Sequence, residues 1–373
     1  MDFSLSEEQQ AARDLSSQIF EQLSHERLKE VEAGEDRIDR KCWGDLAEAG
    51  VLGLPLPEAA GGSGLGYLEA ALVLEEAGRA VAPVPYLATV VMGAMPIARF
   101  GGDALQSRLP GVVAGDTILT AAVVDGALGA DPLQPPTTAT PDGDGFRLDG
   151  LKICVAAGTV ADAILVPAST DGSVGIFVLD PGASGVRIER QETTSGVPEA
   201  RLELDGAIVS AADTLVQGAG GDEALQWLVE RTTTGLCMMA AGVCDRALQM
   251  TADYTKTREQ FERPIATFQA VGQRCADAYI DTQAIKYTAY HAAWRLDQGL
   301  PATAEVAVAK FWTAEGGQRV VHAAQHIHGG IGVDRDYPLH RYFLLAKQLE
   351  LTLGGTTASL LDLGEVIAAP VPA

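Results

Sequence analysis

The sequence predicts an α+β protein of several domains, with helices first, a compact β domain next and a helical bundle last. Three observations lead to this fold class. Apolar residues recur at helical spacing up to about residue 115, short apolar runs separated by turn residues fill the middle, and long helical periodicity returns near residue 220. We therefore expect an N-terminal helical domain (1–115), a middle β-barrel or β-sandwich domain (116–218) and a C-terminal four-helix bundle (219–373).

The N-terminal domain begins with a recognisable helix start. Ser6 and Gln9 have the spacing of a capping box, and apolar residues follow at helical intervals as far as Leu23. Further helices are expected over residues 43–50, 67–81 and 88–100. The pair Gly101-Gly102 ends the last of them, because glycine favours the backbone conformation that closes a helix.

The middle region has the pattern of strands joined by tight turns. The sequences Asp142-Gly143-Asp144-Gly145 and Asp180-Pro181-Gly182 supply typical turn residues. Strands are expected over residues 118–124, 146–155, 161–166, 174–179, 186–189 and 200–209. Residues 134–140 are the one stretch that we expect to be flexible.

The C-terminal region returns to helical periodicity and keeps it over long segments. Helices are expected over residues 222–257, 267–298, 302–328 and 340–351. Because the loops between them are short, neighbouring helices should pack antiparallel as a four-helix bundle.

Composition limits the classes of partner. The chain has 50 acidic and 27 basic residues and a net charge of −23, which disfavours a nucleic acid or an anionic membrane as partner. Five cysteines without CxxC spacing indicate reduced thiols, and the sequence shows neither a secretory leader nor a membrane-spanning run. His322, His326 and His328 lack companion cysteines or carboxylates, so we expect no metal site. We expect a cytoplasmic protein.

Two sequence motifs resemble those of one enzyme family. The run Arg258-Glu259-Gln260-Phe261-Glu262-Arg263-Pro264-Ile265-Ala266-Thr267-Phe268-Gln269 resembles the acyl-CoA dehydrogenase signature RxQFGxPIxxFQ, with Glu262 in place of glycine. Later, His326-Ile327-His328-Gly329-Gly330-Ile331-Gly332 resembles the family's QxHGGxG helix end, with His326 in place of glutamine. The segments 54–79 and 337–341 add further matches, so the resemblance spans nearly the whole chain.

The resemblance implies an FAD cofactor and an acyl-CoA substrate. In such enzymes a carboxylate removes the α-proton of the thioester while the flavin accepts the β-hydride, and an electron-transfer flavoprotein is the expected acceptor. FAD lies across a subunit interface: one subunit holds the isoalloxazine ring and its neighbour contacts the pyrophosphate and adenosine. By position, the neighbour-side residues are Arg258, Gln260, Phe261, Phe268, Gln269, His326, Gly329 and Gly330.

The catalytic carboxylate of the family is missing at both positions where the family carries it. In Leu353-Gly354-Gly355-Thr356-Thr357, Gly354 stands where the glutamate belongs. Relatives that place the base on the first bundle helix have it at the position of Thr232 here, and threonine is no carboxylate base. Glu230 is a weak backup, because residues two apart on a helix point about 200° apart. We therefore assign no catalytic residue to this chain.

The motifs on the flavin-ring side are also altered. Where the family has TEPxAGSD, this chain has Ala121-Ala122-Val123-Val124-Asp125. Where the family has GxKxWITN, the segment 150–157 has Cys154 in place of tryptophan and Ala156 in place of threonine. These substitutes cannot make the family's contacts to the ring and the thioester.

This combination of kept and lost motifs resembles the base-lacking subunit of heterotetrameric steroid side-chain acyl-CoA dehydrogenases. The resemblance implies an α2β2 assembly with a paralogous subunit that carries the glutamate, acting on steroid side-chain CoA esters. One alternative is an active homo-oligomer that uses Glu230 or Asp125 as the base. Another is a structural or regulatory paralogue that binds neither flavin nor CoA.

Overall fold

The computed structural model describes residues 3–127 and 129–369 and divides into two compact units, each built from separated stretches of the chain. Unit 1 comprises Met1–His25, Ala71–Ala82 and Thr233–Ala373, and unit 2 comprises Glu26–Ala70 and Pro83–Thr232. The order of helices, then strands, then helices along the chain agrees with the predicted fold class. The predicted domain boundaries near residues 115 and 218 stay a prediction.

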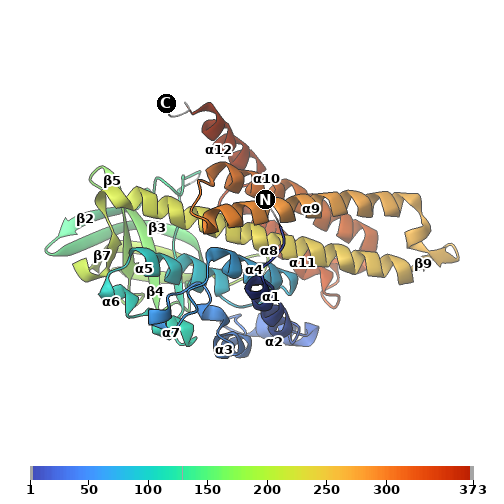
Figure 1. The fold of residues 1–373 in the computed structure, drawn as a ribbon, viewed down its shortest axis with the longest axis horizontal. Coiled ribbons are helices and arrows are strands. Elements are labelled where there is room, and N and C mark those ends of the chain that lie inside the picture. Colours follow the sequence, from blue (N-terminus) through green and yellow to red (C-terminus); the bar gives the residue numbers. More distant parts are fainter. Residues whose placement is uncertain (1–2, 128, 370–373) are drawn as a thin grey trace. The chain divides into compact units, whose positions relative to one another are not determined.

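Unit 1 is helical (Figure 1). Its helices are α1 (Glu7–Phe20), the end of α4 (Tyr67–Arg79), most of α8 (Gly221–Thr257), α9 (Gln269–Asp297), α10 (Thr303–His328), α11 (Leu339–Leu351) and α12 (Thr356–Ala368). The capping box is confirmed: Gln9 N donates to Ser6 Oγ at 3.2 Å, and Ser6 N donates to Gln9 Oε1 at 3.0 Å. The four long C-terminal helices were expected, and α10 packs against α9, α11 and α12.

Helix α12 was not expected from the sequence. Only Ser359 is buried among its residues, whereas Leu361 and Ile367 are 64% and 74% exposed. Because the face that α12 turns towards α10 buries only Ser359, the helix has no buried apolar stripe that periodicity could reveal.

Helices α4 and α8 touch through their backbones at two glycines. A Cβ atom on Gly242 would lie 1.9 Å from the carbonyl oxygen of Glu75, and one on Gly78 would lie 2.0 Å from that of Met239. No side chain fits at these distances, so glycine at both positions allows the close crossing.

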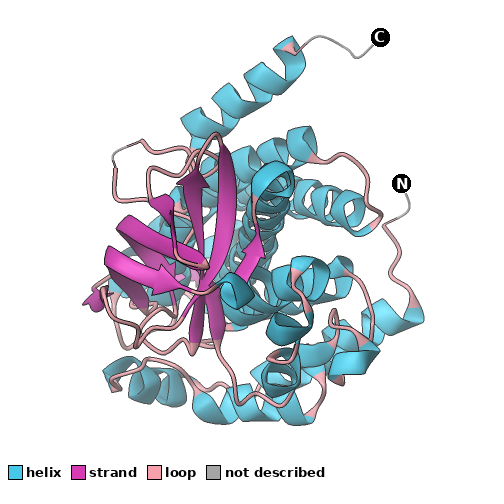
Figure 2. Cartoon of the chain, turned by 90° about the vertical axis from the view of Figure 1, so that its left-hand side faces the viewer, coloured by secondary structure: helices cyan, strands magenta, loops and turns pink. Residues whose placement is uncertain are grey.

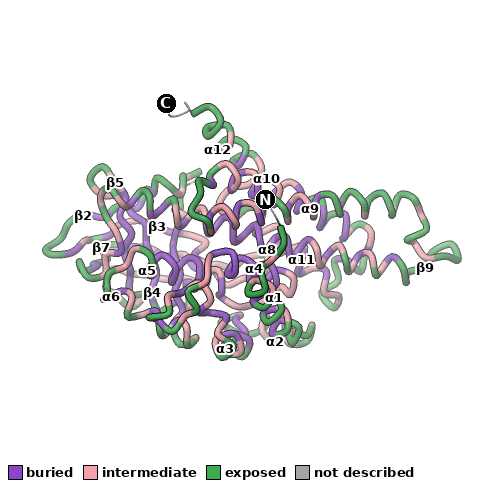
Figure 3. The backbone as a smooth tube through the Cα atoms, in the orientation of Figure 1, coloured by how far each residue is buried: buried purple, intermediate pink, exposed green. Residues whose placement is uncertain are grey.

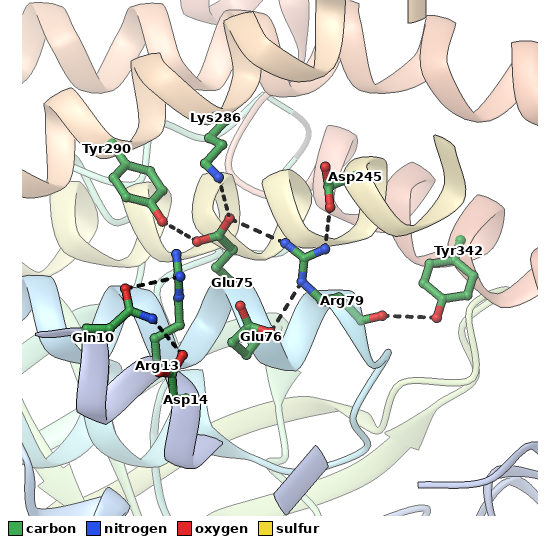
Figure 4. Close-up of polar contacts among 10 residues, drawn as sticks. All are labelled: Gln10, Arg13, Asp14, Glu75, Glu76, Arg79, Asp245, Lys286, Tyr290 and Tyr342. Carbon is green, nitrogen blue, oxygen red and sulfur yellow. Dashed lines mark hydrogen bonds and ion pairs between the residues drawn. The ribbon is translucent and has the colours of Figure 1, made fainter. Parts of the chain in front are cut away.

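A buried polar network surrounds this crossing, joins four helices of unit 1 and lies beside a fifth (Figure 4). Glu75 on α4 is 1% exposed, accepts a hydrogen bond from Tyr290 on α9 and lies 3.7 Å from Lys286 Nζ. Arg79 pairs with Asp245 on α8, and its carbonyl accepts from Tyr342 Oη on α11 at 3.0 Å. The side chains of α1 that lie beside this network are Gln10, Arg13 and Asp14. The buried carboxylate is thus balanced by donors from several helices, as a buried charge requires.

Unit 2 contains an eight-stranded sheet and short helices (Figure 2). The strands are β1 (Leu119–Ala121), β2 (Thr138–Asp142), β3 (Gly145–Ala156), β4 (Ala163–Thr170), β5 (Ser173–Leu179), β6 (Val186–Gln191), β7 (Glu199–Val209) and β8 (Thr214–Val216). Their order is β6-β7-β3-β2-β4-β5-β8, with β1 parallel to β4. One buried cluster, which includes Leu148, Phe177 and Leu202, forms the core of the sheet.

The helices of unit 2 are short, apart from its shares of α4 and α8. They are α2 (His25–Ala33, which begins at the last residue of unit 1), α3 (Arg40–Glu48), α5 (Met95–Phe100), α6 (Asp103–Gln106) and α7 (Leu109–Val113). The helix expected over 88–100 is real, but its first part, Leu87–Ala94, is a π-helix with wider hydrogen-bonded turns.

The expected flexible segment 134–140 is a wrong prediction in its second half. Thr138–Asp142 is strand β2, which pairs antiparallel with β3 through the turn at Gly143. Ala139 is its only buried residue, so the strand lacks the alternation that would have revealed it. Among the described helices, none is both long enough and apolar enough to cross a membrane.

Candidate functional site

The first signature forms a hairpin that connects α8 to α9 in unit 1. Strands β9 (Glu259–Gln260) and β10 (Arg263–Pro264) pair antiparallel around the two-residue turn Phe261-Glu262, and Ile265 N donates to Arg258 O at 2.8 Å. Phe261 is 86% exposed, and Arg258 and Gln260 are exposed too. Figure 3 shows this part of unit 1 as an exposed arm. The side chains of the signature are therefore presented outward, where another molecule can reach them.

The hairpin turn holds two residues in the left-handed backbone region. Phe261 has φ = 54° and Glu262 has φ = 63°, the conformation that a two-residue turn of this type requires. Glycine adopts it without cost, whereas a residue with a side chain is strained there. The family pattern has glycine at position 262. This chain keeps the turn, and the backbone of Glu262 is therefore strained.

We expect Glu262→Gly to raise the free energy of unfolding by about 1 kcal/mol, because the substitution removes the left-handed strain. Thermal or urea unfolding measures the change. Glu259→Gly is the matched control, since Glu259 precedes the turn and does not have positive φ; this variant should be destabilised. Equal effects of the two substitutions would contradict the assignment of strain to position 262.

The second signature lies at the C-terminal end of α10, next to the helices that carry the hairpin. Tyr254 on α8 stacks on His328 with ring centroids 4.3 Å apart, and Arg274 on α9 hydrogen-bonds His326. Helix α10 then ends at His328, and Gly329 directly after it has φ = 64°. The structure therefore brings the ends of α8, α9 and α10 together and places both signatures on the same part of unit 1.

The residues assigned to the cofactor from the sequence fall in these two places. Arg258, Gln260, Phe261, Phe268 and Gln269 belong to the hairpin and the start of α9, and His326, Gly329 and Gly330 belong to the end of α10. All are exposed except Phe268, which is half-buried and lies against Phe261 and the guanidinium of Arg263. Arg274 and Tyr254 could not be singled out from the sequence, because neither belongs to a signature.

The three histidines of α10 each contact another group of the protein. His322 packs edge-on against Phe343, His326 contacts Arg274, and His328 bonds the carbonyl of Ala324 and lies 3.1 Å from Tyr337 Oη. In the described part of the chain, no group of three or more potential ligands could hold a metal ion.

The first position for a catalytic base has a backbone that suits glycine. Gly354 lies between α11 and α12 with φ = 95°, and Leu353 before it has φ = 55°. A Cβ atom on Gly354 would also lie 3.1 Å from the Cβ of Ala358. A glutamate at this position would be strained in the observed conformation.

Lys310 holds the end of α11, just before this segment. Its Nζ donates to the carbonyls of Leu349 at 2.6 Å and Glu350 at 3.0 Å, which fixes the last turn of the helix. Burial lowers the pKa of Lys310 to about 8, although Cys237 and Glu350 act in the opposite direction.

This lowered pKa predicts a pH dependence of stability. The folded chain releases the proton of Lys310 near pH 8 and the unfolded chain near 10.5, so Lys310 contributes stability that is present above pH 10.5 and is lost as the pH falls through about 8. The expected contribution across this window is about 3 kcal/mol. Cysteines and tyrosines titrate in the same pH range. The free energy of unfolding in urea is therefore measured against pH for the wild type and for Lys310→Met, and the variant should lack the pH dependence that Lys310 contributes.

Lys347→Met is the matched control, because Lys347 lies on α11 with a side chain 31% exposed. It should keep the wild-type pH profile. A profile that is the same in wild type and Lys310→Met would contradict the role given to the buried ammonium.

The second position for a base lies in unit 2 and carries a hydroxyl that is already bonded. Thr232 is 2% exposed, and its Oγ1 donates to the carbonyl of Leu228 at 2.8 Å. Glu230 is half-buried and accepts from Gln226 Nε2 at 3.0 Å along the same helix. Neither residue places an unengaged carboxylate at this position.

Asp125, the other alternative base, belongs to a buried ion pair in the sheet. Lys152 Nζ lies 2.6 Å from one carboxylate oxygen, and the hydroxyl and backbone N–H of Thr137 donate to the other. The side chains of Lys152 and Asp125 are 0% and 3% exposed. These contacts favour a structural role for Asp125.

Comparison with known proteins identifies the family. Residues 6–116 match the N-terminal domain of acyl-CoA dehydrogenases, and residues 220–367 match the C-terminal domain. Acyl-CoA dehydrogenase FadE27 of Mycobacterium tuberculosis is 43% identical over 378 residues, covering 99% of both chains. The chain belongs to the acyl-CoA dehydrogenase family. Members of this family are oxidoreductases that bind FAD and act on the CH–CH bond of acyl-CoA.

Two solved structures are also similar to this chain. A chain of the ChsE4–ChsE5 complex from Mycobacterium tuberculosis superimposes with a TM-score of 0.94 at 43% identity, covering 100% of both chains. A chain from a variant of the Tcur3481–Tcur3483 steroid ACAD has a TM-score of 0.92 at 45% identity, covering 98% of this chain and 99% of the other.

The residues present fit the phosphate and ribose part of an FAD site and do not fit the flavin-ring part. The exposed Arg258, Gln260 and the glycine turn at 329–330 supply donors and close backbone approach, which suit phosphate and ribose groups. On the ring side, Ala121 and Ala122 are buried and apolar, and Asp125 is taken by Lys152.

Cys154 does not replace the lost ring contacts. Gln191 Nε2 donates to its Sγ at 3.6 Å, and burial raises the pKa of the thiol to about 11. The side chain is therefore a neutral thiol within the β3–β7 region rather than a reactive thiolate.

Proposed function

We propose that this acyl-CoA dehydrogenase family member is a base-lacking subunit that completes the FAD site of a paralogous, glutamate-bearing subunit in a cytoplasmic α2β2 enzyme. The observation that carries the proposal is Gly354, whose φ of 95° suits glycine and disfavours the family's glutamate. The engaged hydroxyl of Thr232 at the second base position supports it. The proposed substrates are CoA thioesters of steroid side chains.

Two similar structures support the heteromeric assembly and the substrate class. They come from pairs of proteins, ChsE4–ChsE5 and Tcur3481–Tcur3483, and the second pair is called a steroid ACAD. This chain aligns over nearly its full length with a chain from each. The proposed substrate class follows from this likeness and from the combination of kept and lost motifs.

In this proposal the chain contributes binding and positioning rather than proton transfer. When bound, FAD would act as the hydride acceptor, and an electron-transfer flavoprotein would be the electron acceptor of the assembled enzyme. Arg258 would pair with phosphate oxygens, and Gln260 and Gln269 would donate to polar atoms of the cofactor. Phe261, 86% exposed at the tip of the hairpin, would lie against the flat adenine ring of the cofactor.

The test is the visible absorption spectrum of the purified protein. The chain expressed alone should be colourless, and co-expression with a glutamate-bearing paralogue should give a yellow complex that an acyl-CoA thioester bleaches. A yellow, active protein from the single chain would overturn the proposal in favour of a homo-oligomer with another base. A complex with the paralogue that contains no flavin would favour a structural or regulatory role.

A further inference from the structure

A contact between Arg274 and His326 lies beside the proposed FAD residues. Arg274 is on the second turn of α9, and its Nη1 contacts Nδ1 of His326 near the end of α10. Both side chains are exposed. Arginine carries only N–H donors, so the ring nitrogen that faces it has to be the acceptor.

This contact determines which ring nitrogen of His326 carries hydrogen. When Nδ1 accepts, the neutral imidazole holds its proton on Nε2. Nε2 then offers an N–H donor on the other edge of the ring. The family pattern has glutamine at this position, and the amide of glutamine also offers N–H donors. With Arg274 beside it, His326 offers an N–H donor as well. Without Arg274, either ring nitrogen of the histidine could carry the hydrogen.

Exposed arginines commonly form surface ion pairs, but Arg274 does not fit this explanation. Asp277 lies one turn further along α9, yet no ion pair between it and Arg274 is formed in the described part of the chain. Arg319, which lines the same groove of about 460 Å³, does form such pairs, with Asp281 at 2.6 Å and Glu315 at 2.8 Å. Arg274 is instead directed to the end of α10.

We propose that Arg274 is a positioning residue of the FAD site, which fixes His326 as a hydrogen-bond donor to an acceptor atom in the adenosine diphosphate half of the cofactor. The inference rests on the proposed function, since it places His326 among the residues that complete the FAD site. Arg274 belongs to neither signature and acts through the histidine.

The tautomer can be observed directly by nitrogen NMR. The complex with the paralogue is prepared without FAD, with ¹⁵N-histidine in this chain only, and His326→Gln assigns the signal among six histidines. We expect Nδ1 of His326 to show the shift of an unprotonated acceptor and Nε2 that of an N–H. In Arg274→Met the two nitrogens should move toward averaged values. A wild-type ring protonated on Nδ1 would overturn the proposal.

The effect on the cofactor is measured as FAD affinity of the same complex. Arg274→Met should weaken FAD binding by about tenfold, the size of one hydrogen bond, and Arg274→Lys should recover part of it. In a His326→Gln background, Arg274→Met should have little further effect, because glutamine has its own donor. Arg319→Met, which removes the same charge from the same groove, should change the affinity less than twofold.

The outcomes separate the two proposals. If the wild-type complex binds no FAD, the proposed function fails and this inference fails with it. If the wild-type complex binds FAD and Arg274→Met binds it equally well, this inference alone is overturned. Equal losses in Arg274→Met and Arg319→Met would also overturn it, because they would indicate a general charge effect.

Discussion

Asp125→Asn should lower the free energy of unfolding by about 3–5 kcal/mol, because it leaves the fully buried Lys152 without its counter-charge. Burial already lowers the pKa of Lys152, against the opposing effect of Asp125. Without the carboxylate, the folded state has to hold either an unpaired ammonium or a neutral amine in the sheet. Urea unfolding of the purified variant measures the loss.

Two further variants make this prediction specific. Asp142→Asn is the matched control on neighbouring strand β2, where the side chain is exposed, and it should change stability by less than about 0.5 kcal/mol. The double variant Asp125→Leu with Lys152→Met removes both charges and should be more stable than Asp125→Asn. A near-neutral Asp125→Asn would contradict the structural role of the pair and return Asp125 to the candidates for a base.

Arg258→Met should weaken FAD binding to the complex with the glutamate-bearing paralogue by about 10- to 100-fold, the range for losing a charge-assisted hydrogen bond. Arg258 is exposed at the base of the hairpin, and its backbone carbonyl closes the hairpin at 2.8 Å from Ile265 N. The substitution keeps this backbone contact and removes only the guanidinium. Titration of the flavin-free complex with FAD, followed by flavin fluorescence, gives the affinity.

The control for Arg258 lies two residues earlier. Lys256 is 67% exposed and pairs with Asp253, so Lys256→Met removes one positive charge from the same helix end without touching the signature. Its FAD affinity should stay within twofold of the wild type. Equal losses in the two variants would point to the general field of the arm rather than to a specific contact of Arg258.

Much of the fold could be predicted because local chemistry and packing agree. The capping box at Ser6, the turns in the sheet and the long helices after residue 220 all have residues whose own preferences match their surroundings. Strand β2 and helix α12 were not predicted, because β2 buries only Ala139 and α12 buries only Ser359. Periodicity reveals an element only when the element buries a face.

The two motifs of the candidate site could be predicted from the sequence, but the contacts and backbone angles within the site could not. The motifs pointed to the hairpin and the end of α10, because both are continuous in sequence. Arg274 could not be found that way, since it meets His326 across 52 positions of the chain. The backbone angles of Glu262 and Gly354 were likewise inaccessible, because a residue's identity does not determine the φ that its neighbours impose.

The conformation at Gly354 has a consequence for how the base-lacking subunit that we propose could regain a base of its own. A single codon change can restore a carboxylate at position 354, but the backbone there would still favour glycine, and the preceding Leu353 is already left-handed. Reversal therefore requires the whole turn between α11 and α12 to change together with the side chain. In the proposed subunit, a single substitution would therefore not reverse the loss of the base during evolution. Restoring the base by engineering would require the whole turn to be transplanted together with the residue.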